Sequence, residues 1–133
     1  MNEPASILEF PDGIPGFPSS RRFVLSDLTE DAEGPFQVLQ SLDDPTLSMV
    51  VSVPWPFFPD YSPRLDETDR AVLELDDPED AVVFCGVTAD PDNGTVFLNL
   101  LGPFVVNART LRGRQVVLTD PQQPARAPVL LRG

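Results

Sequence analysis

The chain has 133 residues, of which 41% are apolar, and a formal charge of −12 at pH 7. A chain of this length forms one domain with a modest core, and no apolar run approaches the roughly 20 residues of a membrane-spanning helix. We therefore expect a single domain over 1–133, with an ordered core at about 6–131 and no contact with a membrane. The first residues lack a basic segment followed by an apolar one, which predicts no secretory signal, and the single cysteine suits a reducing cytoplasm.

Several residue types on which enzymes depend are missing. The chain contains no histidine and no lysine, so its nine positive charges are all arginines. Histidine is the commonest general base and metal ligand, and lysine forms Schiff bases and holds nucleotide phosphates. A single cysteine cannot build a thiolate zinc site, and Asp90, Asp92 and Asn93 lack the rest of a calcium-binding EF-hand loop. An enzyme or metal protein of this composition would depend on carboxylates alone, so we expect no catalysis and no cofactor.

The charge is unevenly distributed along the chain. Residues 1–95 hold 20 of the 21 acidic groups and four arginines, a charge of −16, whereas residues 96–133 hold one aspartate and five arginines, a charge of +4. An acidic body repels nucleic acid phosphates and favours encounter with basic proteins. Two other interpretations stay open: the acidity serves only solubility, or Arg109, Arg112 and Arg114 contact RNA. Three arginines beside such a body are weak support for RNA, so we expect no direct nucleic acid partner.

Short apolar runs ended by proline, glycine or aspartate recur along the chain, many of them about 8 to 15 residues apart. Such regular short strands are typical of an antiparallel sandwich or barrel. The runs lie at 7–10, 23–28, 36–42, 47–53, 81–87, 96–101, 104–106, 116–118 and 129–131.

Two of these runs and the turn after the second are the most informative. In 47–53 the odd-numbered positions are all apolar, which predicts a strand with one buried face. Residues 81–87 are continuously apolar, as in a strand covered on both faces, so Cys85 is predicted to be a core residue and not a reactive thiol. Residues 90–94 end in asparagine-glycine, a favoured hairpin turn because both residues tolerate positive φ.

One helix is predicted at about 66–75. Asp66 or Thr68 can cap its first turn, where acidic side chains suit the positive end of the helix dipole. The sequence Asp76-Asp77-Pro78 then ends it, because proline cannot continue a helix. The elements together predict a mainly β fold, a small antiparallel β-barrel-like or sandwich domain with one short helix.

The segment Pro54-Trp-Pro-Phe-Phe-Pro-Asp-Tyr61 has four aromatic residues among eight. Four exposed aromatic side chains would form an interaction surface, because large exposed apolar patches on a monomer are usually functional. Two interpretations stay open for this segment. Its aromatic side chains fold inward and cap the core, or they form a partner-binding edge with tryptophan as an anchor.

Five motifs, in order, carry a resemblance to a known family. They are Ile7-Leu-Glu-Phe10 with Asp12-Gly-Ile-Pro-Gly-Phe17; Pro35-Phe-Gln-Val-Leu-Gln-Ser41 with Asp43-Asp44; Asp60-Tyr61; Gly94-Thr-Val-Phe-Leu-Asn-Leu100 with Gly102-Pro103 and Val105-Val-Asn107; and Gln115-Val-Val-Leu118. Over roughly residues 7–131 these motifs resemble the FliW family of bacterial flagellar assembly factors.

The resemblance implies a small antiparallel β-barrel-like protein that is a monomer when free and binds CsrA, a basic RNA-binding translational repressor of flagellin messenger RNA. Proteins similar to FliW hold CsrA away from that RNA and also bind flagellin, so accumulating flagellin releases the repressor. The acidic body agrees with a basic partner. An alternative is a chaperone-like flagellin binder with no role in translation.

The residues that we predict to face a partner come from three segments. Asp43, Asp44, Asp60 and Tyr61 supply polar contacts, and Phe17 and Trp55 supply apolar anchors. The acidic pair has a second interpretation, because aspartate beside a turn often bonds the local backbone. Asn99 and Asn107, at the polar ends of apolar strands, are predicted to close turns through side-chain hydrogen bonds.

Overall fold

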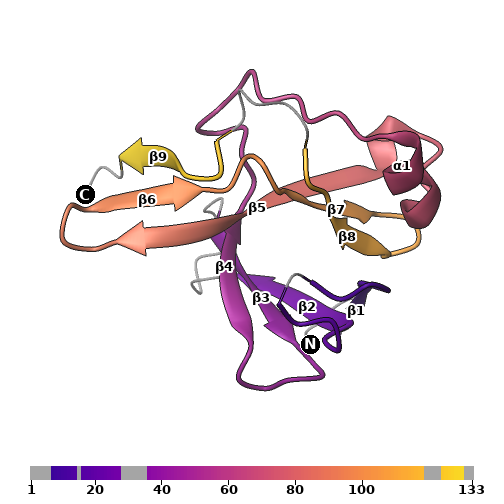
Figure 1. Cartoon of the computed structure of the whole chain (residues 1–133). Coiled ribbons are helices and arrows are strands. Elements are labelled where there is room, and N and C mark those ends of the chain that lie inside the picture. Colours follow the sequence, from indigo (N-terminus) through magenta and orange to yellow (C-terminus); the bar gives the residue numbers. More distant parts are fainter. Residues whose placement is uncertain (1–6, 15, 28–35, 119–123, 131–133) are drawn as a thin grey trace, which may run out of the picture.

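The computed structural model describes residues 7–14, 16–27, 36–118 and 124–130. These residues form nine strands, one α-helix and one short 3-10 helix (Figure 1). In chain order they are β1 (Ile7–Glu9), β2 (Arg22–Asp27), β3 (Phe36–Ser41), β4 (Ser48–Ser52), α1 (Glu67–Leu73), η1 (Pro78–Asp80), β5 (Ala81–Asp90), β6 (Thr95–Leu98), β7 (Phe104–Asn107), β8 (Gly113–Gln115) and β9 (Ala127–Leu130).

The strands form one antiparallel sheet in the order β1-β2-β3-β4-β5-β6-β9, with β7 and β8 attached beside β5. Strand β5 is long enough to pair with three neighbours, β7 along its first part, β4 at its middle and β6 along its last part. One isolated parallel bridge joins Glu9 of β1 to Arg112, which precedes β8. The predicted mainly β, antiparallel fold with one short helix is confirmed, but the sheet is not closed into a barrel.

The buried side chains form two clusters that share β5 and β7 as a common wall. Successive residues of a strand point to opposite faces, so Phe84 belongs to one cluster while Val83 and Cys85 belong to the other. We call the cluster beside β1–β4 the N-terminal core: Leu8, Phe10, Ile14, Phe23, Leu39, Leu47, Val51, Phe84, Phe104 and Val106. We call the cluster beside α1 the C-terminal core: Tyr61, Leu73, Leu75, Val83, Cys85, Val96, Leu98, Leu100, Val105, Val116, Leu118, Ala127 and Val129.

The strand covered on both faces is confirmed in the middle of β5. Cys85 is fully buried there, and burial raises the pKa of its thiol to about 12. The β5–β6 hairpin is also confirmed, with Asp90 opposite Thr95. Only Gly94 of its loop has positive φ, at 63°, because a four-residue loop does not need the two left-handed residues of a tight two-residue turn.

Eight of the nine predicted strands coincide with strands of the structure, and the one at 116–118 is wrong. The strand at this place is β8, which ends at Gln115. Val116 and Leu118 point into the C-terminal core, and their N–H groups donate to Pro103 and Leu101. An apolar alternation marks burial on one face, and it does not establish a continuous ladder of backbone hydrogen bonds. The predicted strand ends at residues 28 and 131 lie outside the described residues.

The predicted helix is confirmed as α1, which ends two residues earlier than expected. The Asp66 carboxylate caps it by accepting a hydrogen bond from the N–H of Asp69 at 2.8 Å. Glu74 adopts the left-handed conformation (φ 54°) after the last turn, which lets Leu75 enter the C-terminal core. Across the described part of the chain, no helix combines the length and apolar character needed to span a membrane.

Candidate protein-binding site

The Asp43 carboxylate joins the β3–β4 turn to the start of β2. It accepts hydrogen bonds from the backbone N–H groups of Arg21 and Arg22, at 2.8 and 2.9 Å, and from the Arg22 guanidinium at 3.1 Å. These bonds favour the ionised form and lower the pKa of Asp43. Its charge is therefore engaged within the chain, and its role toward a partner stays a prediction.

Asp44 and Ser41 organise the same turn. The Asp44 carboxylate accepts from the N–H and the hydroxyl of Thr46, at 3.0 and 2.7 Å, which lowers its pKa. The Ser41 hydroxyl accepts from the N–H groups of Asp43 and Asp44. Asp44 thus bonds the local backbone, as the alternative interpretation of this pair predicted, whereas the Asp43 carboxylate bonds backbone N–H groups at the start of β2.

Phe17 lies on the surface in the connection between β1 and β2, with 43% of its area exposed. Its N–H donates to Ile14 at 2.8 Å, which closes a short turn. Gly13 has φ 69° in this turn, and a Cβ atom there would lie 2.6 Å from the Cα of Pro18. Only glycine fits such a position, so the local sequence holds the exposed phenylalanine in place.

The aromatic segment after β4 combines both interpretations that the sequence left open. Trp55 is 40% exposed, and its indole N–H donates to the Tyr61 carbonyl at 2.9 Å. Phe57 and Phe58 are partly buried against the C-terminal core. Tyr61 is buried in that core, its hydroxyl donates to the Leu100 carbonyl at 2.7 Å, and burial raises its pKa. The structure therefore corrects the partner-facing placement of the Tyr61 side chain.

The six residues predicted to face a partner do not form one patch. Asp43 and Asp44 precede β4, whereas Trp55 and the exposed Asp60 follow it. A strand of the length of β4 spans roughly 16 Å. The structure thus defines two separate candidate surfaces, one at the β3–β4 turn and one at the aromatic segment.

The two asparagines close turns, as the sequence predicted. The Asn99 side-chain oxygen accepts from the N–H groups of Leu101 and Gly102, at 3.1 and 2.9 Å. Asn107 is fully buried and accepts in the same way from Arg109 and Thr110. Its amide also donates to the Leu73 and Glu74 carbonyls, at 2.9 and 3.1 Å, and so ties β7 to the end of α1.

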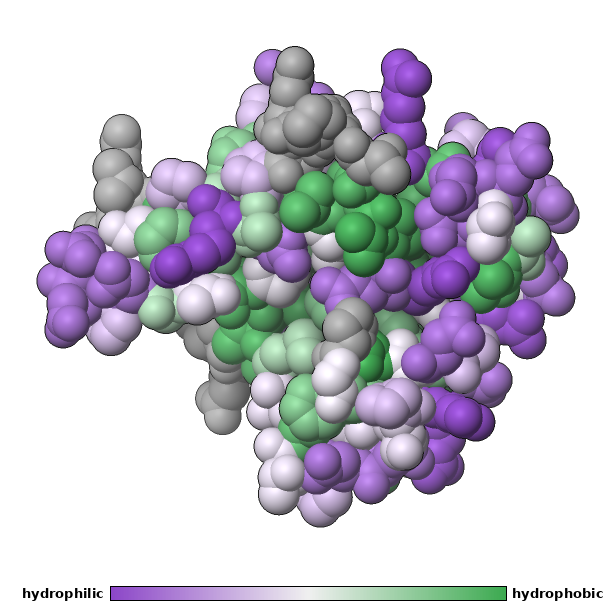
Figure 2. Space-filling model, in the orientation of Figure 1, coloured by the Kyte–Doolittle hydropathy of each residue, from purple (hydrophilic) through white to green (hydrophobic). Residues whose placement is uncertain are grey.

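The arginines considered for RNA contact face acidic side chains of the same chain. Arg109 lies 3.9 Å from Asp80, and Arg112 lies 3.8 Å from Glu74. Arg114 is 3.2 Å from Asp69, the closest approach among these pairs. The arginines therefore neutralise part of the acidic α1 region. Figure 2 shows hydrophilic residues gathered over α1 and a hydrophobic area beside them, toward the centre of the molecule.

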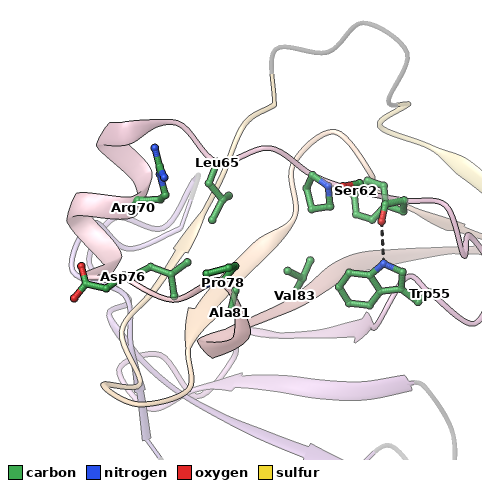
Figure 3. A pocket seen from close by; sticks show the side chains of 11 residues that line it. Trp55, Ser62, Leu65, Arg70, Asp76, Pro78, Ala81 and Val83 are labelled. Atoms are coloured by element: carbon green, nitrogen blue, oxygen red, sulfur yellow. Dashed lines mark hydrogen bonds between the residues drawn. The ribbon is translucent and has the colours of Figure 1, made fainter.

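A cavity of about 460 Å³, which no sequence pattern indicates, lies beside Trp55. Its lining residues are spread over the aromatic segment, α1, η1 and β5, so no local pattern marks them. Figure 3 shows Trp55 at one end and Arg70 and Asp76 at the other, with Val83 and Ala81 between them. The lining residues are Trp55, Tyr61, Ser62, Pro63, Leu65, Arg70, Leu75, Asp76, Pro78, Ala81 and Val83.

The described residues contain no group of three or more His, Cys, Asp or Glu side chains arranged to hold a metal ion. They do combine an acidic surface with an exposed tryptophan and an apolar cavity, which are features of protein-binding surfaces. The fold and the site thus define a small antiparallel β protein with one short helix, an acidic surface and an apolar cavity.

The chain belongs to the FliW family, because the family model described as FliW protein matches residues 2–130. A flagellar assembly factor FliW of Bacillus licheniformis is 38% identical over 120 residues, which cover 90% of this chain and 82% of that protein. The FliW of Bacillus subtilis strain 168 is 36% identical over 92% of this chain and 85% of its own length. The FliW of Treponema pallidum strain Nichols is 37% identical, with coverage of 87% and 75%.

A crystal structure of a flagellar assembly factor FliW has the same fold. It superposes with a TM-score of 0.86 at 31% sequence identity and covers 95% of this chain and 86% of that one. The family to which the five sequence motifs pointed is therefore confirmed from sequence and from structure.

Proposed function

We propose that this chain is a flagellar assembly factor that binds two proteins, the translational repressor CsrA and flagellin. Binding to CsrA relieves repression of flagellin messenger RNA, and binding to flagellin releases CsrA again. Membership of a family whose relatives are named flagellar assembly factors carries this proposal.

The acidic surface beside α1 supports a basic partner such as CsrA. Residues 60–80 contain nine acidic groups and two arginines, a charge of −7. Three of these acids, Asp69, Glu74 and Asp80, lie against arginines of the chain, and no salt bridge within the described residues engages the other six. Carboxylates whose charge is not neutralised by a salt bridge steer positively charged partners and oppose nearby RNA phosphates. The α1 side is thus a better candidate for the CsrA contact than the Asp43 turn.

Calorimetric titration into purified CsrA from the same organism, at low and at moderate salt, tests the proposal. We expect saturable binding that weakens as salt rises, because salt screens exposed charges. Reversing charge with Asp76→Arg and Glu79→Arg, two exposed positions, is expected to weaken binding at least about tenfold at low salt.

The matched control reverses the same amount of charge elsewhere. Glu9→Arg with Asp92→Arg changes exposed residues on β1 and in the β5–β6 loop, and we expect a much smaller effect. A folded wild-type chain that binds CsrA at neither salt concentration contradicts the repressor part of the proposal. Flagellin is then the next titrant, and binding to flagellin alone would favour the chaperone-like alternative.

A further inference from the structure

The cavity beside Trp55 has an apolar floor that belongs to the folded core. Tyr61, Leu75 and Val83 are almost completely buried members of the C-terminal core, and they line the cavity. Leu65 and Ala81 are partly buried against the same core. Because these side chains are held by core packing, the floor is formed before any ligand arrives.

The wall of the cavity is fixed by a hydrogen bond. The Trp55 indole donates to the Tyr61 carbonyl at 2.9 Å (Figure 3). The Tyr61 hydroxyl in turn donates to the Leu100 carbonyl at 2.7 Å. The indole hydrogen bond fixes the orientation of the Trp55 ring at the edge of the cavity, while 40% of the residue's surface remains exposed. Tryptophan is enriched among the residues that contribute most to binding at protein interfaces, so an exposed tryptophan at the edge of an apolar cavity is a candidate anchor for a partner.

One acidic residue, Asp76, lies at the end of the cavity opposite Trp55 (Figure 3). Asp77 and Glu79 are exposed and flank the lining residue Pro78 in sequence. None of these three carboxylates forms a salt bridge within the described parts of the chain. Arg70 is the one cationic residue in the lining. The exposed carboxylates of Asp76, Asp77 and Glu79 make the surface beside this end negative, although Arg70 lines the cavity.

We infer that the cavity receives one apolar side chain from a basic segment of a partner protein, with arginine or lysine residues of that segment against Asp76, Asp77 and Glu79. The inference rests on the proposed function, since it assumes a basic protein partner, and it adds where and how that partner binds. The volume of about 460 Å³ is within the usual range for binding pockets and exceeds what a single leucine or phenylalanine side chain needs. Negative charge beside an apolar pocket selects a cationic partner over an acidic one.

Filling the cavity is the direct test. Ser62 is exposed and lines the cavity, so Ser62→Phe places a ring in the space without replacing a core residue. We expect it to weaken binding of the basic partner protein at least about tenfold, the value of roughly one buried apolar side chain. Thr88→Phe adds the same side chain at an exposed position of β5 away from the cavity and is expected to leave affinity within about twofold.

The single tryptophan of the chain gives a second readout that needs no protein partner. Trp55 borders the cavity, so its fluorescence changes when the cavity is occupied. The probe is a pentapeptide of one leucine flanked on each side by two arginines, titrated to millimolar concentration, where such short peptides bind. We expect a saturable change for wild type and none for Ser62→Phe. The same peptide with serine in place of leucine, or with glutamate in place of arginine, is expected to give none.

The outcomes separate the inference from the proposed function. If wild type binds CsrA or flagellin and a folded Ser62→Phe chain binds equally well, the inference is wrong and the proposed function stands. If wild type binds neither protein, the proposed function fails and the peptide titration decides: a saturable response to the leucine peptide alone supports the cavity as a binding site, and no response overturns it. Should Ser62→Phe not fold, Trp55→Ala replaces it with calorimetry as the readout, and unchanged affinity overturns the inference.

Discussion

The two cores of the molecule share β5 and β7 but differ in what they enclose. The N-terminal core is rich in aromatic rings, and Phe10 packs edge-on against Phe23 and Phe104 at centroid distances of 5.3 and 6.0 Å. The hollow outside it is lined by polar and charged residues, of which Arg22 and Asp43 form a salt bridge. The C-terminal core is mostly aliphatic and continues into the apolar cavity beside Trp55. The two sides of the sheet therefore differ: an apolar cavity with acidic residues beside it is open to solvent at the C-terminal core, and the hollow beside the N-terminal core is polar.

The strongest test of this comparison removes a ring from the N-terminal core. Phe10 is fully buried, and the ring fills the space beside Gly113, where an added Cβ atom would lie 2.8 Å from it. Phe10→Ala leaves an enclosed cavity, so we expect the free energy of unfolding to fall by about 3–5 kcal/mol. Urea denaturation followed by circular dichroism measures it. A loss below about 1 kcal/mol would contradict the closed packing of this core.

The matched variant in the C-terminal core is Leu75→Ala. Leu75 is buried but already borders the open cavity, so its removal enlarges a space that water can enter. We expect a loss of about 2 kcal/mol, the lower end for leucine truncation. Equal losses for the two variants would mean that the cavity is closed in solution and that the two cores do not differ as described.

A loss of stability of similar size is expected at Asn107, which connects β7 to α1. Asn107→Ala removes two donated and two accepted hydrogen bonds at a fully buried position. We expect a loss of about 2–3 kcal/mol, because buried carbonyl groups are left without donors. Asn99→Ala removes only two bonds at a half-buried position and serves as the smaller control in the same urea measurement. An equal loss at both positions would contradict the special role of Asn107.

On the N-terminal side, Asp43 should make the stability of the chain depend on pH, whereas Asn107 does not titrate. Hydrogen bonds from Arg21 and Arg22 hold the pKa of Asp43 below its ordinary value of 3.8, so the unfolded chain binds the proton more tightly than the folded chain. The stability from this group is present above pH 4 and is lost as pH falls through the lowered pKa. Asp43→Asn removes this titration, so unfolding midpoints measured from pH 5 to pH 2 should fall less steeply than those of wild type. If the unfolding midpoints of Asp43→Asn and wild type fall in parallel with pH, the hydrogen bonds from Arg21 and Arg22 to Asp43 do not stabilise the fold.

Most of the fold could be predicted from the sequence because its signals are local. Alternation in 47–53, the continuous apolar run in 81–87 and the capping Asp66 each depend on neighbours in the chain. The strand at 116–118 was wrong because the apolar side chains there are buried in the C-terminal core, while among the described residues the backbone forms only two separate hydrogen bonds, to Pro103 and Leu101. A pattern of buried apolar side chains does not show that a segment pairs with a neighbouring strand.

The candidate site was less predictable, since tertiary contacts decide which residues of a motif remain exposed. Tyr61 and Trp55 belong to one aromatic segment. Tyr61 is nevertheless buried, because its hydroxyl donates a hydrogen bond to the Leu100 carbonyl, whereas Trp55 remains partly exposed. Likewise, the cavity joins residues from 55 to 83 that no spacing rule connects. Motifs identified the family, and only the fold shows where its surfaces lie.

The smallest predicted effect concerns the charge at the cavity, and it tests whether the two sides differ in function as well as in packing. Arg70 is exposed, lines the cavity and opposes a cationic partner there. Arg70→Gln should therefore tighten binding of the arginine-flanked leucine peptide, and of a basic partner protein, about two- to fivefold at low salt, with the gain fading as salt rises. On the N-terminal side, Arg21→Gln removes the same charge at an exposed position outside the cavity and should leave affinity unchanged. If both variants tighten binding equally, only the net charge of the chain matters; if Arg70→Gln weakens it, the guanidinium contacts the partner and the partner's charge near the cavity is negative.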